Sequence, residues 1–250
     1  MNQVTDQQII EILRKEAVPA LGCTEPVACA LACAKCKEVL GGVPERLDVL
    51  VSGNIYKNGM GVGIPGTGMV GLPIAAALGA VCGKSEYGLE VLKEVNVGDN
   101  LQRAKDMLGQ VTVSLKEDAP DKLYAEALAT KGNDTVKVII AHTHTNIVLV
   151  EKNGEEIFKR EFRLDTSKPE DKGPELSVKR IWDFVHEVDV KDIEFVLQGA
   201  EMNKAISAEG LNSEYGLQIG KTLKENIDKG LLEDDLLNRT LIRATAASDA

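Results

Sequence analysis

The chain has 250 residues, a hydrophobic content of 44% and a formal net charge of −10 at pH 7. A chain of this length and composition can bury a substantial core in one large or two small domains. The acidic balance argues against a nucleic-acid or anionic-membrane partner, because both require a positive surface. The N-terminus lacks a secretory signal and no apolar run is long enough to cross a bilayer, so we expect a cytoplasmic protein.

The first part of the chain predicts helices around one strand and a glycine-rich loop. Apolar spacing favours helices at residues 6–15 and 25–40, the second closed by Gly41 and Gly42. Alternation predicts a strand at 46–54, which leads into the loop at 55–71. A small-residue helix at 72–83 and further helices at 87–95 and 100–108 are expected to follow.

From residue 110 the pattern changes to strands, expected at 110–117, 123–131, 134–152 and 155–164. Turn signals at 131–134 and 152–155 mark hairpins. Residues 165–175 indicate an exposed linker, and helices are expected at 176–186, 191–208, 213–229 and from Glu233 onward. The last helix has no capping residue, which predicts a chain that continues.

These elements predict an α/β protein of mixed α+β class, in which a mixed sheet contains antiparallel hairpins. Residues 1–45 would form an N-terminal helical segment that packs with the C-terminal helical part. Residues 46–165 would form a mixed α/β domain, and 166–250 the linker and start of a truncated helical catalytic domain.

Four of the five cysteines lie between residues 23 and 36. Cys29, Cys33 and Cys36 share one helical face, where core packing explains them. Their C-x-x-C spacing matches zinc or redox motifs only nominally, because neither a second ligand pair nor a preceding strand is present. Cys82 is a further incidental cysteine.

Cys23 differs from these cysteines because it precedes the expected helix. Thr24 would be the N-cap, and Pro26 suits the first turn. A thiol there faces the positive end of the helix dipole, which favours the thiolate. Cys23 is therefore a candidate reactive thiol, and a purely structural role is the alternative.

The glycine-rich loop contains two overlapping G-x-G-x-x-G spacings, at 61–66 and 66–71. A dinucleotide site is weakly supported, because Pro65 removes an amide and no second strand ending in an acidic residue follows. Two interpretations remain open: a tight turn with close helix packing, and an anion-binding nest of backbone amides.

Histidines alternate with threonines in the segment HTHTN, residues 142–146. In a strand His142 and His144 would point to one face of the sheet, with Thr143 and Thr145 on the other. Such a pair could hold a metal or move protons, and a polar strand edge is an equally good interpretation.

Four segments resemble the cysteine desulfidase family: ALGCTEPVA (20–28), VSGNIYKNGMGVGIPGTGMVGLPIAAALGA (51–80), HTHTNIV (142–148) and ATAASDA (244–250). This family is related to the alpha chain of iron-sulfur L-serine dehydratases. The resemblance implies an oxygen-sensitive 4Fe-4S lyase without pyridoxal phosphate. It would convert L-cysteine to pyruvate, ammonia and sulfide in cysteine catabolism, or act as a related L-serine dehydratase.

The resemblance also implies roles for particular residues. Cys23 would be a catalytic base or a cluster ligand, with the remaining ligands beyond residue 250, so this chain alone should be inactive and hold no cluster. The substrate-binding residues would be Gly61, Gly63, Gly66, Thr67 and Gly68, with His144, Thr145 and Asn146 as weaker candidates.

The expected partner is a small amino-acid substrate, and a homodimer is one option for the assembly. Two other functions remain as alternatives. One is a binding module that captures a carboxylate or phosphate without catalysis, and the other is a metal-binding protein that uses the four clustered cysteines.

Overall fold

The computed structural model describes residues 4–20, 22–160 and 176–250, which belong to two compact units. The α/β body comprises residues 19–168, and the helical unit comprises 1–18 and 169–250. Helix α1 (Asp6–Glu16) thus groups with the C-terminal helices, whereas α2 (Thr24–Leu40) belongs to the body. The predicted boundary at residue 45 does not coincide with this division, and the expected linker at 165–175 lies outside the described residues.

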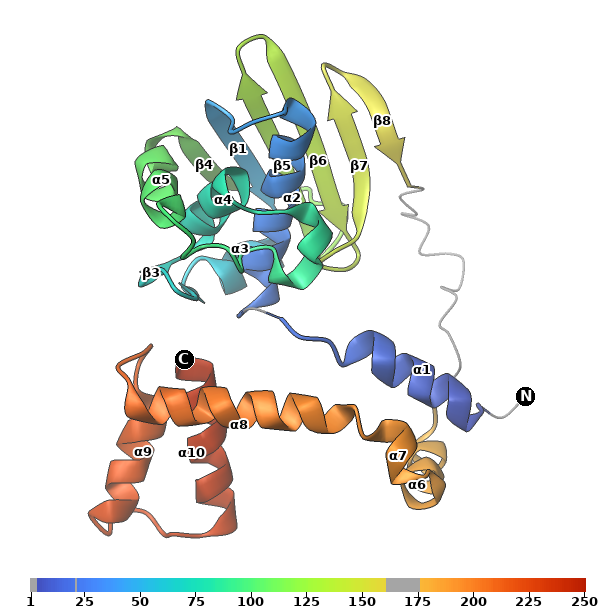
Figure 1. Cartoon of the computed structure of the whole chain (residues 1–250), viewed down its shortest axis with the longest axis vertical. Coiled ribbons are helices and arrows are strands. Elements are labelled where there is room, and N and C mark those ends of the chain that lie inside the picture. Colours follow the sequence, from blue (N-terminus) through green and yellow to red (C-terminus); the bar gives the residue numbers. More distant parts are fainter. Residues whose placement is uncertain (1–3, 21, 161–175) are drawn as a thin grey trace. The chain divides into compact units, whose positions relative to one another are not determined.

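A six-stranded mixed sheet forms the centre of the body (Figure 1), which confirms the predicted mixed α+β class. The strand order is β4-β1-β5-β6-β7-β8, and only β1 and β4 pair in parallel. The strands are β1 (Arg46–Val51), β4 (Val111–Leu115), β5 (Tyr124–Lys131), β6 (Asp134–Ala141), β7 (Ile147–Lys152) and β8 (Glu155–Lys159).

Both predicted hairpins are confirmed. Strands β5 and β6 meet at Gly132, whose φ is 57°, and β7 and β8 meet at Asn153 and Gly154, with φ of 54° and 84°. Positive φ values match the tight turns that join antiparallel strands, and glycine and asparagine adopt them most readily.

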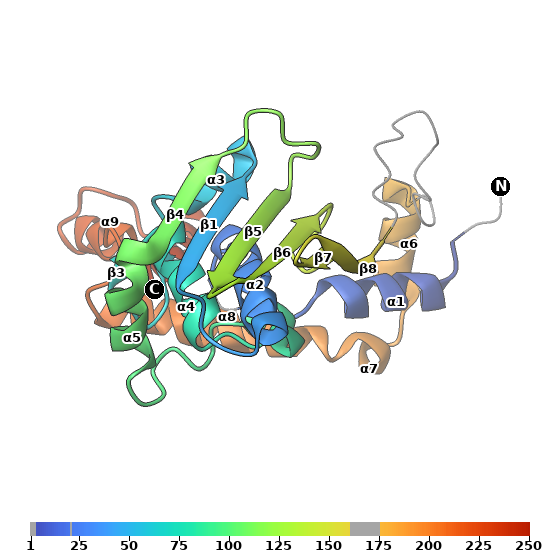
Figure 2. The same cartoon turned by 90° about the horizontal axis from the view of Figure 1, so that it is seen from above.

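Helices α2, α4 (Leu72–Val81) and α5 (Asn100–Met107) lie on one face of this sheet (Figure 2). Alternation along β1 turns Leu47, Val49 and Val51 into the core beneath them. Gly79 of α4 packs directly on the backbone of Ala30 of α2, because a Cβ there would overlap the Ala30 carbonyl. Small residues therefore let these two helices approach closely, and α2 is buried on nearly every side.

The segment between β1 and β4 differs from the prediction. Helix α3 (Gly53–Gly59) occupies the start of the expected loop, and the rest forms a small hairpin of β2 (Gly63–Ile64) and β3 (Met69–Val70). The predicted helix at 87–95 is wrong. This stretch forms a 3₁₀ segment, η1 (Ser85–Glu90), followed by turns. A regular helix cannot pass through Gly88, because its φ of 53° lies outside the helical region. A second 3₁₀ turn, η2 (Leu108–Gln110), follows α5.

The helical unit contains α1, α6 (Val178–Glu187), α7 (Val190–Ile193), α8 (Val196–Asn212), α9 (Ile219–Asp228) and α10 (Leu236–Asp249). The single helix predicted at 191–208 is thus two helices. Arg180 of α6 is almost fully buried, and it donates to the Val4 carbonyl at 2.6 Å and to the Asp6 carboxylate. Gly210 and Gly220 pack on Ala246, where an added Cβ would overlap α10.

Among the described residues, no helix is long and apolar enough to cross a membrane.

Candidate active site at the start of helix α2

The segment GCTEP forms a tight entry into helix α2. Gly22 has a φ of 75°, and a Cβ on it would lie 2.9 Å from the Pro65 ring of the glycine-rich loop. Cys23 is extended and occupies the N-cap position, so the predicted cap at Thr24 is wrong and Thr24 is the first helical residue. Pro26 lies in the first turn as expected, where a missing N–H costs nothing.

The Cys23 thiol is hydrogen-bonded to the side chain of Glu25. The Sγ donates to Oε2 of Glu25 at 2.8 Å, and the other carboxylate oxygen accepts from Nδ2 of Asn58 at 3.0 Å. Asn58 comes from α3, which forms the start of the segment expected as the glycine-rich loop. Cys23 is partly exposed, and the other four cysteines are buried. The Glu25 carboxylate therefore accepts a hydrogen bond from the one accessible thiol of the chain.

His144 joins this cluster from a position 120 residues after Thr24. Its Nε2 lies 3.2 Å from the Thr24 hydroxyl. Burial lowers the pKa of His144, and the nearby Glu25 carboxylate opposes this only in part. The imidazole is therefore neutral at pH 7.

The HTHTN segment is a turn between β6 and β7 rather than part of a strand. His142 has a φ of 70°, and its Nδ1 lies 2.5 Å from Asp121. His142 and His144 thus bond to different groups, and the predicted common face of the sheet is wrong because the backbone turns at this point.

The other two residues of this turn have distinct surroundings. Thr145 is exposed. The Asn146 amide donates to the Ala141 carbonyl at 2.9 Å and accepts from Arg160 at 2.7 Å. Asn146 therefore stabilises the turn that presents His144.

The surroundings of Cys23 favour the neutral thiol. Burial raises the pKa of Cys23 most, and the Glu25 carboxylate raises it further through its hydrogen bond and its negative charge. The backbone amides of Thr24 and Glu25 lower this pKa, as expected at a helix N-terminus, but they do not outweigh the burial. The predicted thiolate is therefore wrong for the resting protein.

The same hydrogen bonds act on Glu25 in the opposite direction. Burial would raise the pKa of this carboxyl, but the Cys23 and Asn58 donors bring it below its usual range. The site thus combines a neutral thiol, a carboxylate and a neutral imidazole.

The glycine-rich loop lies beside this cluster through the contact of Pro65 with Gly22. The Thr67 hydroxyl is hydrogen-bonded within the loop. It donates to the Ile64 carbonyl at 2.6 Å and accepts from the Met69 amide at 2.9 Å. Gly66 needs its hydrogen side chain, since it has a φ of 76° and a Cβ there would approach Asn96.

Three further glycines of the loop face open space. A Cβ added at Gly61, Gly63 or Gly68 would meet nothing within 4 Å. Gly68 has a φ of 65°, which explains its identity, but neither packing nor backbone conformation requires glycine at Gly61 or Gly63. Open backbone at these positions suits close approach by a ligand.

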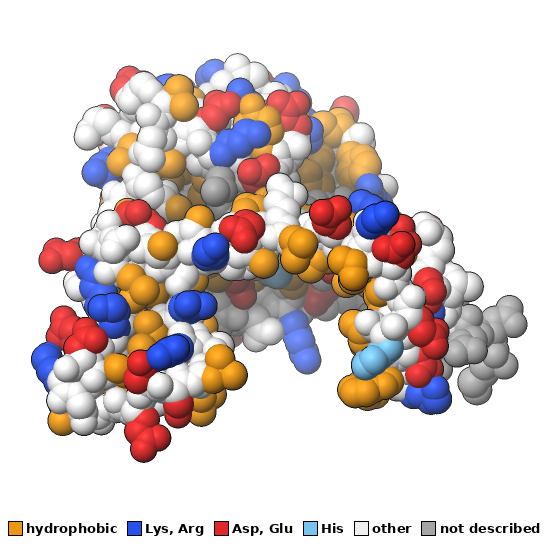
Figure 3. Space-filling model, turned by 60° about the horizontal axis from the view of Figure 1, so that its bottom comes forward, with side chains coloured by type: hydrophobic (Ala, Val, Ile, Leu, Met, Phe, Trp, Pro, Cys, Tyr) orange, Lys and Arg blue, Asp and Glu red, His pale blue; other side chains and the backbone are white. Residues whose placement is uncertain are grey.

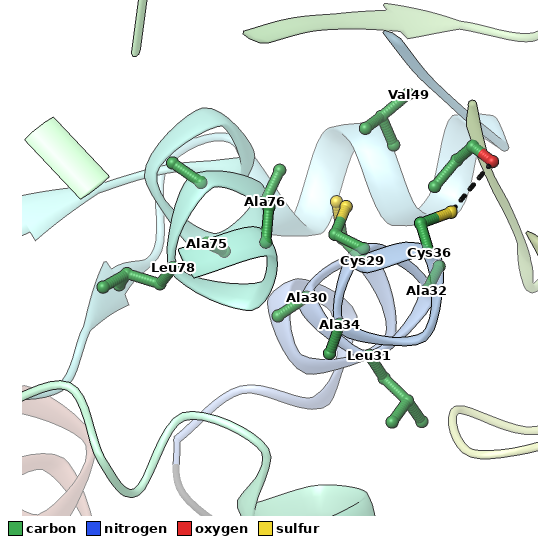
Figure 4. Close-up of a cluster of buried hydrophobic side chains, with 14 of the residues drawn as sticks. Cys29, Ala30, Leu31, Ala32, Ala34, Cys36, Val49, Ala75, Ala76 and Leu78 are labelled. Atoms are coloured by element: carbon green, nitrogen blue, oxygen red, sulfur yellow. Dashed lines mark hydrogen bonds between the residues drawn. The ribbon is translucent and has the colours of Figure 1, made fainter. Parts of the chain in front are cut away.

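The remaining cysteines fill the core, which confirms the packing interpretation. Cys29, Cys33 and Cys36 are completely buried, and the Cys36 thiol donates to the carbonyls of Ala127 and Val136 at 3.5 and 3.6 Å. Figure 4 shows Cys29 and Cys36 on the side of α2 that faces Val49 of the sheet. Burial raises the pKa of both Cys33 and Cys36, which keeps these thiols neutral.

These positions do not fit an iron-sulfur cluster built by this chain alone. Over residues 4–20, 22–160 and 176–250, no group of three or more His, Cys, Asp or Glu side chains is arranged to hold a metal ion. A cluster needs several convergent thiolates, whereas Cys36 bonds to the sheet and Cys23 to Glu25.

Two residues of this site were missed by the sequence reasoning. Glu25 carried a signal, since an acidic residue two positions after a candidate thiol can reach it across the first helical turn. Asn58 carried none, because it lies 33 residues away in sequence and only the fold brings it to Glu25.

The chain is similar to several curated proteins that are named UPF0597 protein. It is 47% identical over 247 residues to the UPF0597 protein of Actinobacillus pleuropneumoniae serotype 3 (strain JL03). This alignment covers 98% of this chain and 57% of the relative. The protein of Dichelobacter nodosus (strain VCS1703A) is 47% identical over 250 residues, covering 99% and 58%. That of Parabacteroides distasonis is 43% identical over 256 residues, covering 100% and 59%.

The chain therefore spans less than two thirds of the length of these relatives. Their names assign no activity. No protein-family model and no solved structure matches the chain.

Proposed function

We propose that proteins with the full length of these relatives are cytoplasmic carbon-sulfur lyases, L-cysteine desulfidases or closely related L-serine dehydratases. This chain would contribute the substrate-facing side of their active site. The observation that carries the proposal is the hydrogen-bonded cluster of Cys23, Glu25 and His144 beside the open glycines of the loop. The resemblance of the GCTEP and glycine-loop segments supplies the reaction class.

Elimination from a β-substituted amino acid needs a base and an acid. The Cα–H and Cβ–S bonds break, a Cα=Cβ bond forms, the α-proton passes to the base, and the leaving sulfide takes a proton. The aminoacrylate product then reacts with water to give pyruvate and ammonia.

The side chains at this site suit both proton transfers. Cys23 is a neutral thiol that can protonate the leaving group. The Cys23 thiolate so formed would regain a proton from solvent after the product leaves, because Glu25 is ionised and has no proton to donate. His144 is a neutral imidazole that can accept the α-proton. The amides around Gly61 and Gly63 would bind the substrate carboxylate.

The resemblance further implies a 4Fe-4S cluster in the full-length proteins, where it would supply a Lewis acid for the leaving group. Its ligand set would have to come mostly from outside these 250 residues, because the described cysteines do not converge.

The test is an anaerobic assay of the full-length Actinobacillus pleuropneumoniae relative after reconstitution with iron and sulfide. Release of sulfide and pyruvate from L-cysteine, or of pyruvate from L-serine, is expected. Substitution of its residue aligned with Cys23 by alanine should reduce turnover by about a hundredfold or more, the usual effect of removing a proton-transfer group. Turnover of neither amino acid would contradict the proposal.

A binding module without catalysis is the second candidate, favoured by the open backbone at Gly61 and Gly63. It predicts saturable binding of a small carboxylate or inorganic phosphate by a protein that turns over neither amino acid. Replacing Gly61 or Gly63 by valine should then weaken the binding.

A further inference from the structure

Large apolar side chains are exposed along the helices of the helical unit (Figure 3). On α10 the exposed fractions reach 83% for Leu236 and 74% for Leu237, and on α6 Trp182 is 64% exposed. Exposed aromatic and aliphatic side chains in such number mark a surface that another element covers.

The inner corner between α8 and α10, called here the α8/α10 corner, contains a cavity of about 740 Å³. Figure 1 shows α10 crossing α8 near the C-terminal end of α8. The cavity is lined by small and apolar residues and by polar ones, namely Asn203, Lys204, Ser207, Ala208, Leu211, Thr240, Arg243, Ala244 and Ala247. Its small side chains would let a further backbone approach closely.

A serine hydroxyl lines this corner. Ser207 as a whole residue is only 6% exposed. Its hydroxyl makes no hydrogen bond with any residue in the described part of the chain, whereas Thr240, across the corner, bonds to the Leu236 carbonyl at 2.8 Å. No buried side-chain polar atom of the described residues lacks a hydrogen-bond partner, so the Ser207 hydroxyl is accessible from the corner and can pair with a polar group that enters it.

The charged side chains of the corner are cationic. Lys204 and Arg243 line it together, and no acidic side chain does. Within the described ranges Arg243 has no ion pair, and Lys204 has only a loose, exposed contact with Glu201 at 3.7 Å. In a chain of net charge −10, this cationic corner favours an acidic occupant.

We propose that the α8/α10 corner is the docking site of a helical segment with a small apolar face and acidic flanks. This segment comes from the part of the full-length proteins that the chain does not span. The Actinobacillus pleuropneumoniae relative has 57% of its length matched by this chain, so the unmatched remainder is long enough to supply several helices. An acidic side chain of the segment pairs with Arg243 and Lys204, and a polar group accepts from or donates to Ser207.

The test supplies this occupant as a separate polypeptide. The unmatched part of the Actinobacillus pleuropneumoniae relative is co-expressed with the tagged 250-residue chain, and the purified complex is measured by light scattering. A one-to-one complex is expected, and Ala244→Trp, which fills the corner from an exposed position, should weaken it at least about tenfold. The matched control is Ala205→Trp, on the exposed surface of α8 outside the corner.

A second pair of variants tests the charge. Arg243→Gln should weaken the complex severalfold, and Arg239→Gln, one turn earlier on α10 and paired with Asp234, should leave it unchanged. In the full-length relative, tryptophan at the residue aligned with Ala244 should lower the melting temperature. This variant makes the test independent of whether the separate polypeptide dissolves.

Three results would overturn the proposal. The first is equal binding by Ala244→Trp and the wild type. The second is an unchanged melting temperature of the full-length variant. The third is self-association of the 250-residue chain that Ala244→Trp abolishes, which would assign the corner to a second copy instead.

Discussion

The α/β body and the helical unit differ in how far their large apolar side chains are buried. In the body α2 and α4 are buried on nearly all sides against the sheet, and few large apolar side chains reach the solvent. In the helical unit one small cluster around Ile9, Ile10 and Phe184 is buried, while most other large apolar side chains stay exposed. The body thus has a complete core of its own, and the helical unit has apolar faces that need further cover.

The largest expected effect is on the buried leucines of the body. Leu78 of α4 is fully buried, so Leu78→Ala should lower the free energy of unfolding by about 2–5 kcal/mol. Leu237→Ala, at a site that is 74% exposed in the helical unit, should change it by less than about 0.5 kcal/mol. Urea denaturation of both variants measures the contrast, and similar losses would show that Leu237 is also covered in solution.

The contact of α2 with α4 gives the next effect. Gly79→Ala should destabilise the body by about 3 kcal/mol, since the new Cβ would meet the Ala30 backbone. Without this contact, replacing glycine by alanine within a helix would raise the free energy of unfolding by about 1 kcal/mol. A decrease in the free energy of unfolding would therefore identify the contact with Ala30 as the cause. Gly61→Ala, where nothing lies within 4 Å, is the matched control for thermal unfolding.

Arg180 anchors α6 to the N-terminal segment in the helical unit. Arg180→Met removes the donors to the Val4 carbonyl and to Asp6, and should cost about 1–3 kcal/mol. The emission of Trp182, the chain's only tryptophan and a residue of the same helix, reports unfolding of this unit directly. An unchanged unfolding midpoint would mean that the apolar cluster around Ile9, Ile10 and Phe184 is sufficient to hold α6 in place.

Alkaline pH should weaken the body through its buried thiols. Burial raises the pKa of Cys36 in the folded state, so the unfolded chain loses this proton first. The stability from Cys36 is complete below its ordinary pKa of about 8.5 and decreases above it, by roughly 2 kcal/mol at pH 10. Unfolding of the wild type and of Cys36→Ala from pH 7 to 10 tests this, and parallel pH curves would contradict it.

The smallest effect concerns the reactivity of Cys23. Because its pKa is raised, iodoacetamide should modify Cys23 slowly at pH 7 and faster as the pH rises, while the buried cysteines react only after the body unfolds. Glu25→Gln removes the negative charge and should lower the pKa of Cys23, so that alkylation at pH 7 becomes severalfold faster. A slower reaction in this variant would mean that Glu25 favours the thiolate instead.

Local patterns were sufficient to predict many of the longer elements of the body, though not α3, β2, β3 or η1. Small apolar residues closed by Gly41, in the left-handed conformation with a φ of 73°, predicted helix α2 almost to its ends. Glycine and asparagine turns predicted both hairpins. Cys23 could be singled out because its position before the helix is a local feature.

The sequence by itself therefore determined two hairpins and most of the longer strands and helices, because these depend on periodicity and on turn residues close together in the chain. It did not predict the small β2/β3 hairpin or the turn that separates β6 from β7. Only the tertiary structure decided the state of the site. Thr24 meets His144 across 120 residues and Glu25 meets Asn58 across 33, and burial reverses the expected effect of the helix dipole on Cys23. Such effects depend on which surfaces exclude water, and no local pattern in the sequence specifies that.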